Sequence, residues 1–249
     1  MKNYTKDTIL NQLNSISNDI AKAFDALYSQ ELTEIAEEMA ISYQILHDII
    51  NREDQSRISD ADFQSALLFW TALNTYLSAI ELFRRGYNKE PQMLLRNVIE
   101  TFSAAYDIHV NPKKLAILLN KPKDFNSKQS VKVAKQIHPV ISQMWGNLSG
   151  RFSHVSIMHT VPHRTAPLCV GGLFEPKDQD AVVCGILSVL NLVMEIMGSV
   201  LEFTFIAELQ SPRFWKKIST DSYAYITPKV NAERGKRIMK ILKASANNK

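Results

Sequence analysis

The sequence is poor in the residues on which disulfide-rich, redox-active and turn-rich folds depend. Its two cysteines, Cys169 and Cys184, belong to no Cys-x-x-Cys pair, which predicts two reduced thiols rather than a zinc knuckle or a redox motif. With 8 glycines and 9 prolines in 249 residues, the chain has few turn formers, and this argues against an all-β sandwich. The first seven residues contain no apolar run, so we expect no secretory signal.

The common catalytic signatures are also missing. The chain has no Gly-rich phosphate loop, no His-Glu-x-x-His and no Gly-x-Ser-x-Gly sequence. His159 and His163 have a spacing that suits a metal only on a helix, and Pro162 lies between them. No acidic or cysteine neighbour completes a zinc ligand set there. We therefore expect neither a metal nor a cofactor.

Charge is unevenly distributed along the chain. The formal net charge is +4, but residues 1–62 carry a net charge of −7 and the remainder carries +11. An acidic end and a basic remainder can attract each other, either within one chain or between chains. A basic body can also contact nucleic acid, although ordinary solvated helix faces give the same composition. The last 21 residues are basic, with a net charge of +6, and form either an amphipathic helix or a solvated tail.

Apolar residues recur at steps of three and four over most of the chain, which predicts helices. The sequence signal for a break between the first two predicted helices is weak, so one long bent helix is an alternative. Gly86 ends the third and Asn111-Pro112 the fourth, so the short link between these two predicts an antiparallel hairpin. The predicted helices cover roughly 5–29, 31–51, 60–85, 90–109, 113–119, 131–136, 139–150 and 177–209.

These elements predict an all-α multi-helix bundle of about seven to nine helices, with an irregular Pro/Gly loop near 160–176. We divide it into an acidic helical pair (1–58), a main helical core (59–209) and a basic C-terminal extension (210–249). The helix over 177–209 is apolar enough for a membrane span, but Glu195 and Glu202 interrupt it, which favours a buried core helix. We expect a soluble cytoplasmic protein that forms a homo-oligomer and binds no membrane.

A polar stripe runs along the fourth predicted helix. Arg96, Glu100, Ser103 and Asp107 fall on one face of an otherwise apolar segment. The stripe is either the only solvent-exposed edge of this helix or a buried row of polar side chains. Arg96 and Glu100 have the spacing of a helical ion pair, so they form a structural pair or support a functional site.

A second group of polar residues lies between Trp145 and His159. Arg151 can hold a phosphate in a forked geometry, and His154 can act as a general acid or base because its ordinary pKa is near neutrality. Ser153 can line the same site, and His159 is a further candidate. The alternative is a segment that ends a helix and whose histidines cap backbone carbonyls.

The predicted hairpin, with Arg84-Arg85-Gly86-Tyr87 and Leu94-Leu95-Arg96-Asn97-Val98-Ile99-Glu100, followed by Leu148-Ser149 and Phe152-Ser153-His154, resembles HEPN-like helical bacterial proteins of the toxin and defence group. The resemblance covers about residues 60–160. The family's ribonuclease motif places four to six residues between Arg and His, whereas two separate Arg151 from His154 and seven separate Arg151 from His159.

The resemblance implies a helical bundle, often dimeric, that cleaves RNA without a metal. Arg151 and either His154 or His159 would be catalytic, with Arg96, Glu100 and Ser153 in support. The histidine would assist attack by the ribose 2′-hydroxyl, and the arginine would stabilise charge on the phosphate. Two other classes stay open. One is a non-catalytic interaction, assembly or regulatory module that binds a partner protein, and the other is a membrane-associated protein that uses the helix over 177–209.

Overall fold

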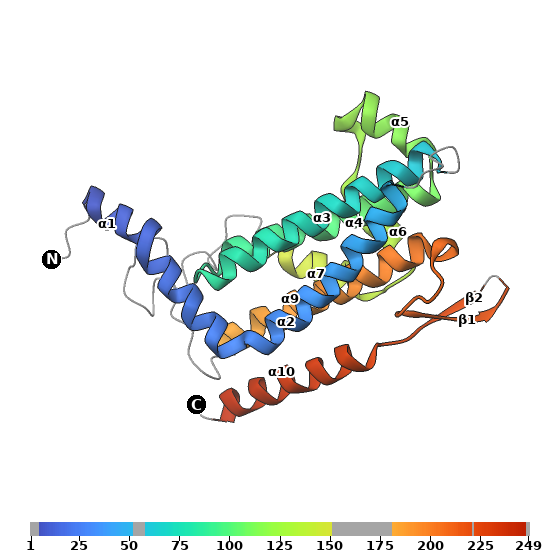
Figure 1. Cartoon of the computed structure of the whole chain (residues 1–249). Coiled ribbons are helices and arrows are strands. Elements are labelled where there is room, and N and C mark those ends of the chain that lie inside the picture. The colour runs from blue at the N-terminus through green and yellow to red at the C-terminus, as the bar shows by residue number, and fades with distance from the viewer. Residues whose placement is uncertain (1–4, 52–57, 151–180, 221, 248–249) are drawn as a thin grey trace.

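The computed structural model describes residues 5–51, 58–150, 181–220 and 222–247, and it confirms an all-α bundle (Figure 1). Among these residues only one small two-stranded sheet accompanies the helices. The predicted Pro/Gly loop near 160–176 lies outside the described residues.

The N-terminal segment is one helical run, made of α1 (Lys6–Asn11), the π-helix η1 (Gln12–Ile16) and α2 (Ser17–Ile50). It bends at Tyr28, where φ is −125° and ψ is 28°, so the long bent helix is the correct alternative.

Helices α3 (Asp60–Arg84) and α4 (Lys89–Val110) form the predicted antiparallel hairpin and pack along their length. The hydroxyl of Ser59 accepts a hydrogen bond from the amide of Asp62 and caps α3. Gly86 follows the last turn with φ of 90°, a left-handed conformation that glycine adopts without steric cost. The sequence therefore predicted this hairpin correctly at both ends of α3.

Shorter helices follow α4 in the sequence and pack against it. They are α5 (Lys113–Asn120), the 3₁₀ turn η3 (Pro122–Asp124), α6 (Ser127–Ala134) and α7 (Val140–Leu148). The side chain of Asp107 on α4 is fully buried. It accepts hydrogen bonds from Lys114 of α5, Ser130 of α6 and Asn111, which follows α4. A buried carboxylate needs such partners, so Asp107 joins the hairpin to α5 and α6.

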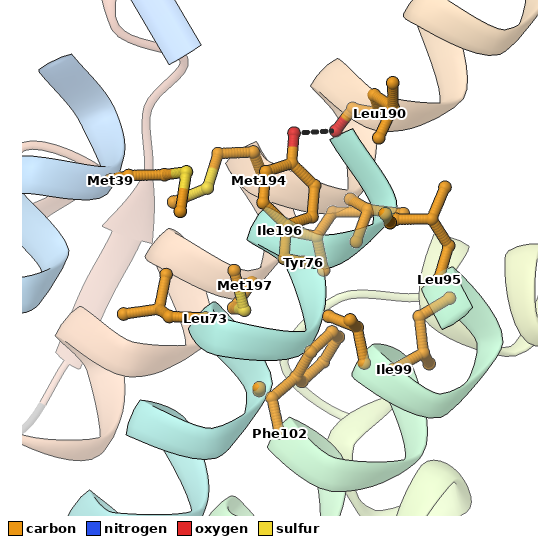
Figure 2. Close-up of a cluster of buried hydrophobic side chains, with 14 of the residues drawn as sticks. Met39, Leu73, Tyr76, Leu95, Ile99, Phe102, Leu190, Met194, Ile196 and Met197 are labelled. Carbon is orange, nitrogen blue, oxygen red and sulfur yellow. Dashed lines mark hydrogen bonds between the residues drawn. The ribbon is translucent and has the colours of Figure 1, made fainter. Parts of the chain in front are cut away.

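Helix α9 (Ala181–Thr204) lies at the centre of the bundle and contacts α2, α3, α4 and α10. Figure 2 shows its residues Met194 and Met197 among apolar side chains from α3 and α4. Tyr76 of α3 donates its hydroxyl to the carbonyl oxygen of Leu190, 3.0 Å away. Helices α3 and α9 are both long and apolar enough to cross a membrane. However, 72% of the apolar stretch of α9 is buried within the protein, as in a core helix.

A β-hairpin that we did not predict follows α9. Helix α9 ends at Thr204, not near 209, and a 3₁₀ turn, η7 (Ile206–Glu208), leads to β1 (Trp215–Ser219) and β2 (Ser222–Tyr225). The buried carboxylate of Glu202 accepts hydrogen bonds from the backbone amides of Arg213 and Phe214 and holds the start of the hairpin on α9. Strands of four and five residues with no clear alternation carry too weak a pattern for a sequence-based prediction.

The basic C-terminal segment is a helix, α10 (Lys229–Asn247), that packs against α9 and pairs with acidic residues of α2. Arg234 Nη2 lies 2.8 Å from Glu38 Oε2, and Arg237 Nη2 lies 2.5 Å from Glu34 Oε1. The acidic N-terminal part and the basic C-terminal part thus attract each other within one chain. The Arg234 and Glu38 side chains are only 2% and 6% exposed, so their pair is shielded from water.

We predict that Arg234→Ala lowers the free energy of unfolding by about 3–5 kcal/mol, because it leaves the buried Glu38 carboxylate without its cation. Urea unfolding followed by circular dichroism measures the change. Lys229→Ala is the matched control, because Lys229 lies on the same helix and is 90% exposed. Equal, small effects of the two substitutions would contradict the buried pairing of α10 with α2.

Candidate functional site

Two of the predicted site residues, Arg96 and Glu100, form an ion pair on α4. Arg96 Nη2 lies 2.9 Å from Glu100 Oε1. The two residues are four positions apart in a helix, so their side chains leave the same face one turn from each other. The Arg96 side chain is 30% exposed and that of Glu100 is 18% exposed, which places the pair at the edge of the core rather than within it.

Helix α7 and Ser149, the residue that follows it, supply two further side chains to this pair. The indole N–H of Trp145 donates to Glu100 Oε1 at 2.8 Å, and Arg96 Nε donates to Ser149 Oγ at 3.0 Å. The Arg96 guanidinium carbon also lies 5.8 Å from the centre of the Trp145 ring, within the range of a cation–π contact. We call Arg96, Glu100, Trp145 and Ser149 the α4–α7 cluster.

The α4–α7 cluster engages both of its charged groups internally. The carboxylate of Glu100 accepts from Arg96 and from Trp145, while Arg96 also binds Ser149. Such charge-assisted hydrogen bonds fix the two helices at a defined distance and orientation. Among the described residues Arg96 uses Nε and Nη2 in these contacts, and no hydrogen bond involves its Nη1.

The rest of the polar stripe on α4 is a buried row of polar side chains rather than a solvent-exposed edge. Ser103 and Asp107 are both 0% exposed. Asp107 is satisfied by the contacts already given, whereas the hydroxyl of Ser103 has no hydrogen-bond partner among the described residues. The exposed part of the stripe is therefore limited to Arg96 and Glu100, at the end nearer the hairpin turn.

The remaining predicted site residues, Arg151, Ser153, His154 and His159, lie outside the described residues. Ser149 is two positions before Arg151 in the sequence, so the α4–α7 cluster ends where this polar segment begins. Convergence of these four residues with Arg96 and Glu100 stays a prediction. Trp145 and Ser149 were not predicted as site residues, because their contacts with α4 span 45 and 53 positions and leave no local pattern.

Comparison with known proteins identifies no relative: no family model, no curated protein and no solved structure matches the chain. The HEPN-like resemblance therefore stays a prediction that rests on this chain's own residues.

A second polar cluster, which the sequence analysis missed, joins α10 to α2 and α9. Besides the Glu38–Arg234 pair, the side-chain amide of Asn231 lies 3.4 Å from carboxylate oxygens of both Glu38 and Glu195. Two carboxylates thus meet one guanidinium and one amide in a region where Glu38, Asn231 and Arg234 are all buried. Its members come from residues up to 196 positions apart, so only the folded chain reveals the cluster.

Two aromatic side chains, Tyr225 and His138, border the same cluster on the side of the β-hairpin. Tyr225 of β2 donates its hydroxyl to Glu195 Oε1 at 2.5 Å, and burial raises the pKa of Tyr225 well above its ordinary value, with the Glu195 bond as a further cause. The His138 ring packs edge-on against Tyr225, 4.7 Å between ring centres. Burial lowers the pKa of His138, and the Glu195 charge opposes this shift only in part. The contacts of the cluster consequently hold α10 and the β-hairpin against α2 and α9.

A third group of polar side chains, the pair of His109 and Asp62, borders a small hollow. The sequence analysis did not predict this pair. His109 Nδ1 lies 2.6 Å from Asp62 Oδ1, and both side chains are about one-third exposed. The hollow has a volume of about 90 Å³, enough for a few water molecules but small for an organic ligand. The pair joins the start of α3 to the end of α4 and so serves the packing of the hairpin.

We predict that Trp145→Phe lowers the free energy of unfolding by about 1–2 kcal/mol, because it keeps the ring but removes the hydrogen bond to the half-buried Glu100 carboxylate. Urea unfolding measures this change. Trp70→Phe is the control, because the indole N–H of Trp70 has no hydrogen bond among the described residues. Indistinguishable losses in the two variants would show that the bond to Glu100 does not hold α7 on α4.

Proposed function

We propose that this protein is a cytoplasmic helical interaction module that acts by binding another protein surface. The observation that carries the proposal is the internal pairing of the α4–α7 cluster, in which Glu100 Oε1 has two donors and Arg96 has three contacts. The contacts of this cluster among the described residues join α4 to the end of α7, as expected of side chains that hold two helices together.

An apolar surface on the N-terminal helical run supports the same proposal. Residues 6–16, here called the N-terminal arm, lie at one end of the molecule, and α1 contains no buried residue (Figure 1). Ile9, Leu10 and Ile16 are 43%, 41% and 41% exposed. Grouped exposed apolar side chains of this kind mark an interface. A second copy of the chain is the proposed partner, because two-fold dimers are the commonest soluble assemblies.

The double variant Ile9→Glu/Ile16→Glu is expected to convert a dimer into a monomer, because it places two carboxylates in the proposed apolar contact. Size-exclusion chromatography with light scattering measures the mass. The wild-type protein should run at twice the mass of the chain and the variant at the mass of one chain.

Asn11→Glu/Ser15→Glu is the matched control for this experiment. It adds the same two charges to the N-terminal arm at positions that are already polar and exposed. The control should stay dimeric. A monomeric wild-type protein, or dissociation of the control as well, would rule out self-association through the apolar side chains of the arm.

A second candidate function is a metal-independent endoribonuclease of a HEPN-like type, within a bacterial toxin–antitoxin or defence system. The observation that favours it is the contact of Arg96 with Ser149, which brings an Arg–Glu pair to the residue that stands two positions before Arg151. In this proposal RNA is the partner. His154 or His159 would assist the 2′-hydroxyl, and Arg151 would stabilise the charged phosphate.

The ribonuclease proposal predicts that expression arrests growth and yields RNA fragments that end in a cyclic phosphate. Arg151→Ala, His154→Ala and His159→Ala are compared with the wild-type protein by RNA end-mapping. At least one of these variants should lose cleavage while its circular dichroism spectrum and thermal midpoint stay unchanged. Cleavage that persists in all three folded variants, or its absence in the wild-type protein, would exclude this candidate.

A further inference from the structure

Helix α6 carries three exposed lysines on one side. Lys128 and Lys132 lie four positions apart, and Lys135 follows three positions later, directly after the last helical residue. At about 1.5 Å of rise per residue, they span about 10 Å along the helix axis. We call these three residues the lysine face. Val131 and Ala134, on the other side of α6, are buried in the core and keep the lysine face directed outward.

The lysine face is part of a larger basic region. Lys113 on α5, with Lys121 and Lys123 around the turn η3, are also exposed. Residues 113–135 contain seven lysines and a single acidic residue, Asp124. Within the described part of the chain, Lys114 is the one lysine of this region that has an ion pair, and its partner is Asp107. The other six lysines have no ion pair among the described residues, so their positive charges add to the local potential.

The basic helix α10 differs from this region in its surroundings. Arg234 pairs with Glu38, and Arg237 pairs with Glu34 and lies near Glu31. Acidic residues of α2 thus offset much of the positive potential of α10. Asp124 is the one acidic residue of α5, η3 and α6 themselves, and the exposed Asp60 of α3 lines a hollow beside α5 rather than α6. Local potential consequently favours α6 over α10 as a contact for an anionic polymer.

The character of the lysine face favours nucleic acid over an anionic membrane. A helix that lies on a membrane inserts an apolar face beside its basic face, whereas Val131 and Ala134 of α6 are already packed in the core. The exposed apolar side chains of Ile117 and Leu119 belong to α5 and lie outside the lysine face. Phe125, the one aromatic residue of this region, is half-buried, so the region lacks exposed rings on which unpaired bases could stack. Lysines without aromatic neighbours recognise phosphates rather than bases.

We propose that the lysine face, together with Lys121 and Lys123, binds the phosphate backbone of double-stranded nucleic acid without reading its sequence. This surface lies apart from the N-terminal arm and shares no residue with the α4–α7 cluster. It therefore does not depend on either function proposed above.

Fluorescence anisotropy with labelled duplexes of about 20 base pairs tests the proposal, with salt varied from about 50 to 200 mM. One duplex is RNA and the other is DNA of the same sequence. The wild-type protein should bind at least one of them, with an affinity that falls steeply as salt rises. The variant Lys128→Glu/Lys132→Glu/Lys135→Glu should bind more than about tenfold more weakly and show a shallower salt dependence, because three phosphate contacts are lost.

Lys236→Glu/Lys240→Glu/Lys243→Glu on α10 is the matched control. It makes the same change at the same spacing, at positions that are also exposed. The control should retain binding within about threefold. The milder variant Lys128→Gln/Lys132→Gln/Lys135→Gln, which conserves the helix and removes charge without reversing it, should show an intermediate loss.

Three results would overturn the proposal. They are no duplex binding by the wild-type protein at the lowest salt, an equal loss of binding in the α6 and α10 variants, and binding through the lysine face to phosphatidylserine vesicles but to neither duplex. Stronger binding to RNA than to DNA, lost in the α6 variants, supports the proposal and assigns the duplex to RNA.

Discussion

The fold depends on covering most of the surface of α9. This helix is predominantly apolar, so leaving it in water would cost about 25 cal/mol for each Å² of exposed apolar surface. Helices α2, α3, α4 and α10 each contact it, and residues such as Val193, Met194 and Val200 have almost no exposed surface. The arrangement of these four helices follows from this requirement, because each must turn its own apolar stripe toward α9.

The buried polar contacts occur where these covering elements meet. Glu202 holds the β-hairpin to the end of α9, Glu38 and Arg234 hold α10 against α2, and Asp107 holds α5 and α6 against α4. Each buried carboxylate has hydrogen-bonding or charged partners, because an unpaired buried charge would destabilise the fold by several kcal/mol. The α4–α7 cluster follows the same rule at lower burial. This similarity is the physical reason to interpret it first as a contact between helices.

Sequence periodicity was sufficient for the long helices and for the α3–α4 hairpin, because each has an apolar stripe and a recognisable end at Ser59, Gly86 or Asn111. It also placed Arg96 and Glu100 on one face. It failed for the β-hairpin, whose short strands depend on Glu202 and Ser199 for their position. It could not find the contacts of Trp145, Ser149 and Asn231, since partners 45 to 193 positions apart leave no pattern in a single sequence.

Hydrogen exchange of the α9 amides in aqueous buffer without detergent tests most directly whether this chain covers its own apolar helix. The account predicts that amides of residues 183–204 exchange only through global unfolding, whereas those of α5, which has no buried residue, exchange far faster. If the α9 amides exchanged as fast as those of α5, or if the protein stayed folded only in detergent, α9 would be covered by something other than this chain and the bundle described here would be wrong.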